Sequence, residues 1–365
     1  MTQSSQKNRI IFIDLMRAFA VLQMVQGHTT DVLLSNDYRN AEYLGYAIWN
    51  FMRGMTAPIF LFSAGTVFTY LFRLVNKPFN ENTRVGKGFK RVALLIFIGY
   101  MLRFPTPTLI DFSFVSNAQW RVFFSVDVLH LISVSLFMVI FLSWVSEKIK
   151  LGDILTFSAA TLFFFFCSFY VEQVQWTNYL PRPLAAYMYS VTGSLFPLFP
   201  WSGYVLAGAV LGSFLAKNPG IFKSAKFSYW LFGAGLAVML FAFVVESLQF
   251  YWLGNIKTWN TSPFYVFFRL GFVLVLNSIV SFISLKVESI PKILILLGRN
   301  TLLIYVVHLV ILYGSAWSVG ISLWYSKKLN IGFTIGAALL MISLMVAMVL
   351  IISKLKIKNK QLVTS

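Results

Sequence analysis

The sequence predicts an all-α membrane protein, a polytopic bundle of about ten transmembrane helices with both termini in the cytoplasm. Three observations support this fold class. Hydrophobic residues make up 58% of the 365-residue chain, charged residues make up only 12%, and short polar gaps separate long apolar runs. Soluble domains carry a much larger charged share. We therefore expect one integral-membrane domain over residues 1–365, without an attached soluble domain.

Ten apolar segments are long enough to cross a bilayer. A helix needs roughly 20 residues, with some variation, to span the hydrocarbon core. In chain order the predicted segments are about 11–34, 47–72, 89–105, 127–146, 152–171, 194–216, 228–248, 264–285, 293–316 and 331–353.

Lysine and arginine predict the orientation of these segments. Short cytoplasmic loops are enriched in both residue types, and 20 of the 30 basic residues fall on one side of an alternating arrangement that begins with Lys7 and Arg9. The formal charge of +18 is therefore explained by membrane topology. Because the basic residues do not gather on a folded face, we expect no nucleic-acid partner. Cys167 is the single cysteine, which excludes an internal disulfide, and we expect no bound metal.

The first segment carries a stripe of ionisable residues. At 100° per residue, Arg17 and His28 lie within about 20° of each other around the helix, and Asp14 lies within about 40° of His28. The rise along the helix places His28 roughly 16 Å further out than Arg17. Ionisable groups inside a span usually face a bundle interior or a cavity. The alternative is a snorkelling arginine and a histidine that a neighbouring helix satisfies.

Four more residues are candidates for the outer half of the membrane. Asp127 and His130 stand three residues apart, so they could share a substrate pocket, or they could cap a helix. His308 lies near mid-membrane, where it could face a substrate or be a packed, hydrogen-bonded histidine. Arg53 lies at the outer edge of the second segment, where ordinary interfacial anchoring is the alternative.

A cationic stretch on the cytoplasmic side, "NENTRVGKGFKR", contains Arg84, Lys87, Lys90 and Arg91 beside two glycines. Such side chains and accessible backbone N–H groups could bind anionic phosphates. The general enrichment of cations in cytoplasmic loops would produce the same stretch.

Four stretches in order along the chain resemble a known family: "IDLMRAFAVLQMVQGH", "APIFLFSAG", "FPLFPWSGYVLAGAVLG" and "GRNTLLIYVVHL". The family is the group of integral-membrane acyltransferases that includes the heparan-alpha-glucosaminide N-acetyltransferase catalytic domain and the bacterial acyltransferase family 3. Arg17 and His28 are separated by ten residues, and this spacing looks like the Arg-x10-His signature of acyltransferase family 3. The Pro-Trp and Gly-Arg-Asn stretches look more like the heparan-alpha-glucosaminide N-acetyltransferase branch.

The resemblance implies an enzyme that moves an acyl group from acetyl-CoA, or another acyl-CoA, in the cytoplasm to a sugar on the far side of the bilayer. It implies that His28 is catalytic, with Arg17 beneath it. From the residues themselves we expect Asp14 to belong to the same catalytic stripe, and His28 either to remove the acceptor's proton or to take the acyl group transiently. We expect Arg17 to hold the CoA side together with the loop cations Arg84, Lys87, Lys90 and Arg91. We expect the acceptor to be bound by Asp127, His130, His308 and Arg53. The loop after His28 contains no histidine, although the animal lysosomal members place their active histidine there. The catalytic role therefore follows the bacterial pattern, and the choice between O- and N-acylation stays open.

A transporter or flippase of a small molecule or lipid-linked sugar is the alternative from another class. Ion-coupled transporters generally need carboxylates or broken helices near mid-membrane. The chain has only 12 acidic residues, and Asp14, Asp127 and Glu246 lie near segment ends. We expect a localisation in the bacterial cytoplasmic, or inner, membrane. A membrane protein that has lost activity is a third alternative.

Overall fold

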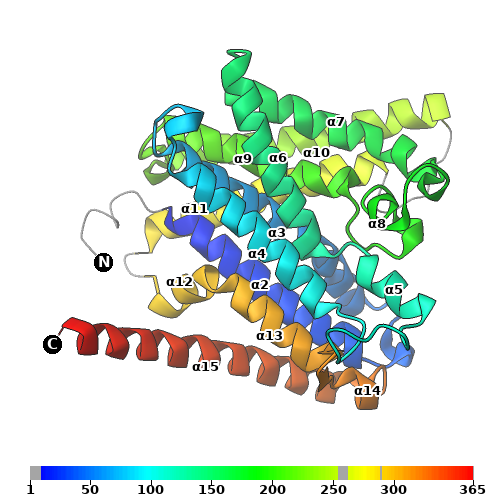
Figure 1. Ribbon diagram of the computed structural model, residues 1–365. Helices are drawn as coiled ribbons and strands as arrows, with labels where there is room; N and C mark the ends of the chain where they lie inside the picture. The colour runs from blue at the N-terminus through cyan, green and yellow to red at the C-terminus, as the bar shows by residue number, and fades with distance from the viewer. Residues whose placement is uncertain (1–9, 254–261, 288–289, 365) are drawn as a thin grey trace. The chain divides into compact units, whose positions relative to one another are not determined.

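The computed structural model describes residues 10–253, 262–287 and 290–364, and helices dominate these ranges (Figure 1). Lys7 and Arg9 lie outside the described residues. The chain divides into two compact units, which we call unit 1, with Leu61–Leu285, and unit 2, with Ile10–Phe60 and Lys286–Ser365. Helix α3 (Leu44–Arg73) runs from unit 2 into unit 1.

Unit 2 is built around α2 (Ile11–Leu33). The helices α12 (Lys292–Arg299), α13 (Thr301–Tyr313) and α15 (Ile331–Thr364) all pack on it, and Figure 1 shows α13 running along the blue α2 with the red α15 beside it. Asn300 breaks the helix between α12 and α13, which are bent by 74°. Because α2 is apolar on most faces, it can bury side chains such as Met16, Val21 and Val25 against several partners at once.

The connections that follow α2 and α13 in unit 2 are hydrogen-bonded to each other at the C-terminal end of α2. After α2 come η1 (Asn36–Tyr38) and α3, while after α13 come the short strands β1 (Gly314–Ser315) and β2 (Ser318–Val319) and the helix α14 (Ser322–Tyr325). The Lys327 and Leu329 amides donate to the carbonyls of Val32 and Leu33, and the Ser35 amide donates to Leu329. The last turn of α2 is thereby held in a fixed position relative to the α14 connection.

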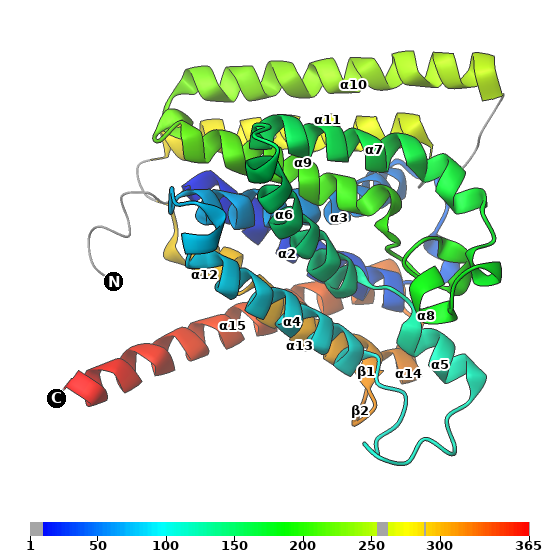
Figure 2. The same cartoon turned by 45° about the horizontal axis from the view of Figure 1, so that its top comes forward.

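Unit 1 contains the remaining helices. Figure 2 shows α7, α9, α10 and α11 as neighbouring helices that run in similar directions. The elements are η2 (Phe79–Glu81), α4 (Arg84–Leu102), α5 (Asn117–Phe124), α6 (Val128–Lys148), α7 (Asp153–Gln173), η3 (Trp176–Asn178), α8 (Arg182–Ala185), η4 (Ser190–Thr192), α9 (Leu198–Lys217), η5 (Ile221–Lys223), α10 (Ala225–Leu253) and α11 (Pro263–Lys286).

Glycines allow α9 to pack closely on α3. A Cβ at Gly208 would overlap the Phe62 carbonyl, and one at Gly212 would press on the Thr66 carbonyl. A Cβ at Gly65 would overlap Val205 of α9 in the same way. Small residues spaced four apart let helix backbones approach in membranes. These glycines therefore serve helix packing.

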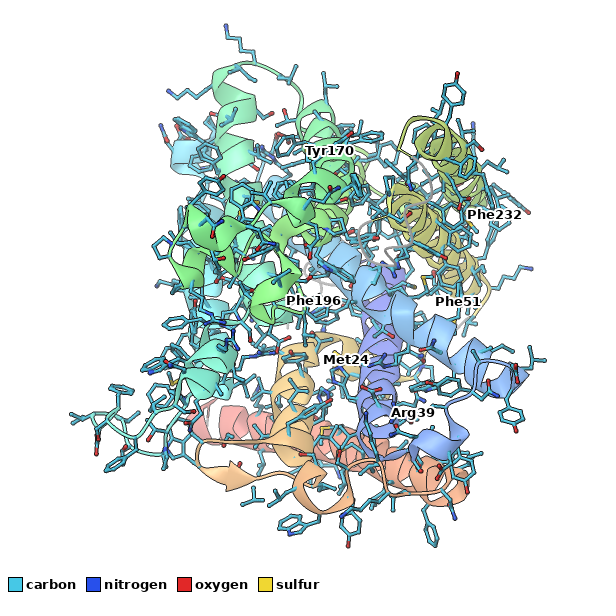
Figure 3. All side chains as sticks on the ribbon, turned by 90° about the vertical axis from the view of Figure 1, so that its right-hand side faces the viewer. Met24, Arg39, Phe51, Tyr170, Phe196 and Phe232 are labelled. Carbon is cyan, nitrogen blue, oxygen red and sulfur yellow. The ribbon has the colours of Figure 1, made fainter. Side chains whose placement is uncertain are left out.

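Seven helices among the described residues are long and apolar enough to cross a membrane: α3, α6, α7, α9, α10, α11 and α15. The bent pair α12–α13 gives an eighth if it counts as one span. Their outer surfaces are apolar: Tyr170 of α7 and Phe232 of α10, both labelled in Figure 3, are 59% and 38% exposed. Such surfaces suit lipid. The chain is an integral membrane protein.

All ten predicted segments coincide with helices, but α2 and α4 are not among the seven that are long and apolar enough to cross a membrane. The four cations of α4 and the polar residues of α2 lower their apolar character. The number of ten spans and the cytoplasmic position of both termini therefore stay predictions, as does the single domain over residues 1–365.

Candidate active site

His28 and His308 meet inside unit 2. His28 lies near the C-terminal end of α2, and His308 lies in the middle of α13. Nδ1 of His28 is 3.0 Å from Nε2 of His308, and the two ring planes are inclined by 21°. His308 is 0% exposed, whereas His28 is half-buried. The packing of α13 on α2 therefore brings together two histidines that are 280 residues apart in the sequence. We call them the histidine pair.

Three groups surround this histidine pair. His308 Nδ1 is 2.8 Å from the backbone carbonyl oxygen of Ile304, one helical turn earlier. The Tyr305 ring packs edge-on against His308, with 5.8 Å between the ring centroids. Tyr313 does the same against His28 at 6.3 Å. The His308 ring is therefore held by a hydrogen bond on each nitrogen and by an aromatic neighbour.

Arg17 and Asp14 lie further down the same face of α2, next to the junction of α12 and α13. The Arg17 guanidinium donates to the hydroxyl of the buried Thr301, with 2.9 Å between Nη2 and Oγ1. Gly298 of α12 lies directly against the Asp14 backbone. The stripe predicted from helical geometry thus faces α12 and α13.

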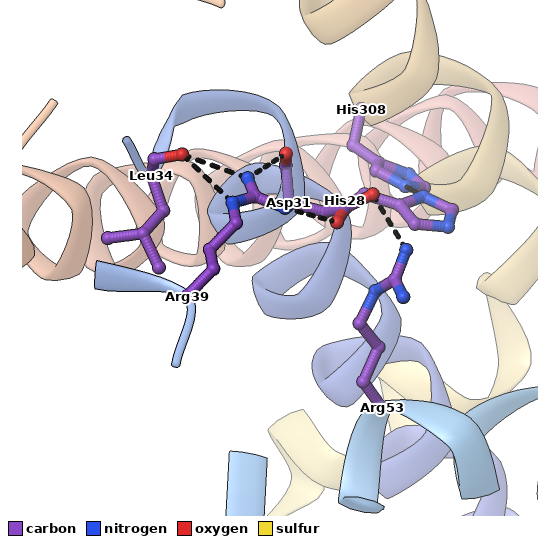
Figure 4. A network of polar contacts seen from close by, with 6 residues as sticks. All are labelled: His28, Asp31, Leu34, Arg39, Arg53 and His308. Carbon is purple, nitrogen blue, oxygen red and sulfur yellow. Dashed lines mark hydrogen bonds and ion pairs between the residues drawn. The ribbon is translucent and has the colours of Figure 1, made fainter. Parts of the chain in front are cut away.

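Asp31, one turn beyond His28, is shared by two arginines (Figure 4). Arg53 Nη2 is 2.7 Å from Asp31 Oδ2, and Arg39 Nη1 is 3.1 Å from Asp31 Oδ1. Arg39 also donates to the carbonyls of Asp31 and Leu34, which are left open where α2 ends. The network therefore holds two positive charges and one negative charge beside the histidine pair.

Arg53 reaches this network across Gly27. Its Cγ would lie 3.8 Å from a Cβ at Gly27, and its guanidinium lies 5.9 Å from the centre of the Trp49 ring. Figure 4 shows the guanidinium of Arg53 directed toward Asp31 and the His28 ring. At 40% exposure, Arg53 is the more accessible of the two arginines, since Arg39 is 16% exposed.

Asp127 and His130 form the N-terminal cap of α6 in unit 1. The Asp127 carboxylate accepts from the Val128 amide, and the Asp127 amide donates to His130 Nδ1. Arg103 forms an ion pair of 3.2 Å with Asp127 and also donates to Ser125. Asp127 and His130 therefore cap a helix, which was the alternative to a shared substrate pocket. A role in substrate binding stays a prediction.

His130 is enclosed by α4. The side chain is 1% exposed, its ring lies edge-on to Tyr100 at 4.3 Å, and a Cβ at Gly99 would press on the imidazole. Burial and then a hydrogen bond with Tyr100 raise the pKa of Tyr187, which lies in the connection after α7.

The four predicted phosphate-binding cations lie in the first two turns of α4. Arg84, Lys87 and Arg91 fall within about 60° of one another around the helix, and Lys87 and Lys90 are exposed. The first turn of α4 carries no acidic residue, and Thr83 makes no side-chain cap. Positive side chains thus stand at the positive end of the helix dipole, an arrangement that an anion would stabilise.

Residues 9–255 match the family model described as heparan-alpha-glucosaminide N-acetyltransferase, catalytic. The chain belongs to this family. The resemblance seen in the sequence is therefore confirmed for this branch. A comparison with curated proteins finds no match.

The matched family and the apolar helices together make the chain a member of a family of membrane acetyltransferases. The matched residues include Asp14, Arg17 and His28, and the match ends before Thr301 and His308. Of the predicted site residues, the structure gathers Asp14, Arg17, His28, Arg53 and His308 in unit 2, and places Arg84, Lys87, Lys90, Arg91, Asp127 and His130 in unit 1.

Sequence reasoning missed three members of the unit 2 site of this acetyltransferase-family protein. Asp31 follows His28 by one helical turn, and that spacing could have identified it. Arg39 follows α2 in a polar gap between two apolar runs, and Thr301 belongs to the "GRNTLLIYVVHL" stretch, but no sequence pattern singles out either residue. Among the described residues, no group of three or more His, Cys, Asp and Glu side chains is arranged to hold a metal ion.

Proposed function

We propose that the protein is a membrane acyltransferase that moves an acyl group, acetyl in the first instance, from cytoplasmic acyl-CoA to a sugar or glycan on the extracytoplasmic side. The proposal places it in the bacterial inner membrane as one ten-span domain with both termini in the cytoplasm. Family membership and the apolar helices support this proposal. The contact between His28 and His308 is the observation that supports a catalytic role for particular atoms.

In the proposed reaction, His28 is the general base. A hydroxyl or amine of the acceptor attacks the thioester carbonyl, the new C–O or C–N bond forms, and the C–S bond breaks. His28 takes the proton of the attacking group and returns it to the leaving thiolate. An imidazole suits this role because its ordinary pKa is near neutrality.

Arg17 supplies positive charge deeper along the same stripe as His28. Its hydrogen bond to Thr301 fixes the direction of the guanidinium, which suits a group that stabilises anionic charge on the donor. Asp14 lies three residues earlier on α2, and its negative charge balances the positive charge of Arg17 in this proposal.

The cations of α4 bind the phosphates of acyl-CoA in this proposal. Their clustering at the helix N-terminus, without a neighbouring acidic residue in the first turn, supports it. On the acceptor side, Arg53 is the strongest of the proposed binding residues, because its guanidinium is partly exposed beside His28. Asp127 and His130 have weaker support because the cap of α6 already uses both.

The test is transfer from labelled acetyl-CoA by the full chain in liposomes, with identification of the labelled product. We expect His28→Ala and His28→Gln to reduce transfer by roughly 10²-fold or more, the usual contribution of general base catalysis. Gln26→Ala is the matched control, because it changes the same helix about 200° around from His28. Wild-type transfer by both His28 variants would contradict the role of His28. A transporter or flippase would leave acetyl-CoA intact.

A further inference from the structure

The hydrogen bonds of His308 determine where its proton lies. A backbone carbonyl oxygen can only accept a hydrogen bond, so His308 Nδ1, 2.8 Å from the Ile304 oxygen, must be the donor. A neutral imidazole carries one N–H, and a proton on Nδ1 leaves Nε2 as an acceptor. The complete burial of His308 favours the neutral form, because burying a charge is costly.

The state of His308 then determines the state of His28. His308 Nε2 accepts, so His28 Nδ1, at 3.0 Å, must be the donor. In neutral His28 this places the single proton on Nδ1 and the lone pair on Nε2. The order of the relay is therefore His28 Nδ1–H to His308 Nε2, followed by His308 Nδ1–H to the Ile304 carbonyl.

We propose that His308 is a positioning residue that holds His28 in the Nδ1–H tautomer, so that Nε2 of His28 is the atom that takes the acceptor's proton. The catalytic consequence rests on the proposed function. This role replaces substrate binding for His308, whose side chain is 0% exposed. One nitrogen of a catalytic histidine is commonly fixed by the hydrogen bond that the other nitrogen makes.

The same hydrogen bond assists the proton transfer. When Nε2 of His28 gains a proton, the ring becomes an imidazolium, and its Nδ1–H then donates a charge-assisted hydrogen bond to His308. His308 does not need to change its own protonation, and the Ile304 carbonyl keeps it oriented. Without His308, both tautomers of His28 are accessible, and the Nε2–H tautomer has no lone pair at the reacting position.

The number of histidines makes the tautomers measurable. The chain has three histidines, so ¹⁵N-histidine labelling of the full protein gives three pairs of ring signals. The variants His28→Gln and His308→Gln assign them. We expect the wild-type protein to show a protonated Nδ1 and an unprotonated Nε2 for both His28 and His308. A proton on Nε2 of neutral His28 would overturn the proposal.

Two substitutions at His308 then test positioning against a merely structural role. Gln can place an amide oxygen near the original Nε2, so His308→Gln should keep the His28 tautomer and most of the kcat. Leu offers no acceptor, so His308→Leu should allow both His28 tautomers and lower kcat by roughly 10²-fold, with little change in KM for acyl-CoA. An unchanged His28 tautomer in His308→Leu would overturn the proposal, even if that variant is less active.

The two readouts separate this proposal from the proposed function. The tautomers are measured without any substrate, so the expected signals support positioning by His308 whatever reaction the protein performs. Absence of acyl transfer in a wild-type protein with these signals counts against the proposed function alone. A wild-type protein that transfers acyl groups while its neutral His28 carries the proton on Nε2 counts against the positioning role alone.

Discussion

Gly298 of α12 lies so close to Asp14 of α2 that a Cβ on Gly298 would overlap the Asp14 carbonyl oxygen. This approach places the α12–α13 junction against the part of α2 that carries Arg17. We expect Gly298→Ala to destabilise the protein by about 1–3 kcal/mol, as overpacking typically does, and to lower the midpoint of thermal unfolding by several degrees. Gly336→Ala on α15 is the control, because no atom lies within 4 Å of its added Cβ. Equal midpoints for the two variants would contradict the close packing.

The hydroxyl of Thr301 supports Arg17, and its removal should cost activity. Thr301→Val keeps the shape of the side chain and removes the acceptor of the 2.9 Å hydrogen bond. We expect a loss of about 1–2 kcal/mol in stability, since hydrogen bonds to charged groups are worth about that much or more, together with a several-fold lower rate of acyl transfer.

Thr334→Val is a matched control for this substitution. Thr334 is 1% exposed, and its hydroxyl has no hydrogen-bond partner among the described residues. Loss of that hydroxyl should leave thermal stability and transfer unchanged or slightly improved, because no hydrogen bond is broken. A similar loss of activity in both variants would mean that the Thr301 hydroxyl has no special role.

Arg39 and Arg53 share Asp31 but should differ in what their loss changes. Arg39 binds backbone carbonyls of Asp31 and Leu34 at the end of α2, so Arg39→Gln should mainly lower the unfolding midpoint. Arg53 is more exposed, and Arg53→Gln should cost less than about 1 kcal/mol of stability, as surface ion pairs do. In steady-state kinetics, Arg53→Gln should raise KM for the acceptor several-fold. A larger stability loss at Arg53 than at Arg39 would contradict this division.

Gly99 makes room for the ring of His130 in unit 1. Gly99→Ala would push its Cβ into the imidazole and disturb the cap of α6, so we expect a lower unfolding midpoint, by a few degrees. Gly86→Ala, on the same helix, meets no atom within 4 Å. It should stabilise α4 slightly, since alanine is the better helix former. Measured side by side, the unfolding midpoint should fall for Gly99→Ala and rise slightly for Gly86→Ala. Shifts of the same sign would contradict the prediction.

The cations of α4 should set the affinity for acyl-CoA. We expect Lys87→Ala and Arg84→Ala each to raise KM for acyl-CoA by roughly 2- to 10-fold, corresponding to a partly screened ionic contact, with a smaller effect at high salt. Lys226→Ala, an exposed lysine at the start of α10, controls for the change in net charge. A KM that is insensitive to all three substitutions would remove α4 from the proposed CoA site.

Much of the fold follows from local rules that the sequence carries. Each of the ten long apolar runs is helical, because a segment with few polar side chains satisfies its backbone hydrogen bonds within a helix. The close packing through Gly208 and Gly212 was also predictable from the spacing of the small residues. The number of membrane spans was less predictable, since α2 and α4 are helical but carry polar residues whose environment depends on their neighbours.

For the candidate site, the sequence by itself determined that Asp14, Arg17 and His28 lie on one stripe of α2, because helical geometry is local and fixes their angles. Only the tertiary structure decided what that stripe meets. His308 is 280 residues from His28, and Thr301 is 284 residues from Arg17. Hydrogen bonds of this range depend on how α12 and α13 pack on α2, which depends on the shape of contacts such as Gly298 against Asp14. No periodicity within one helix contains that information.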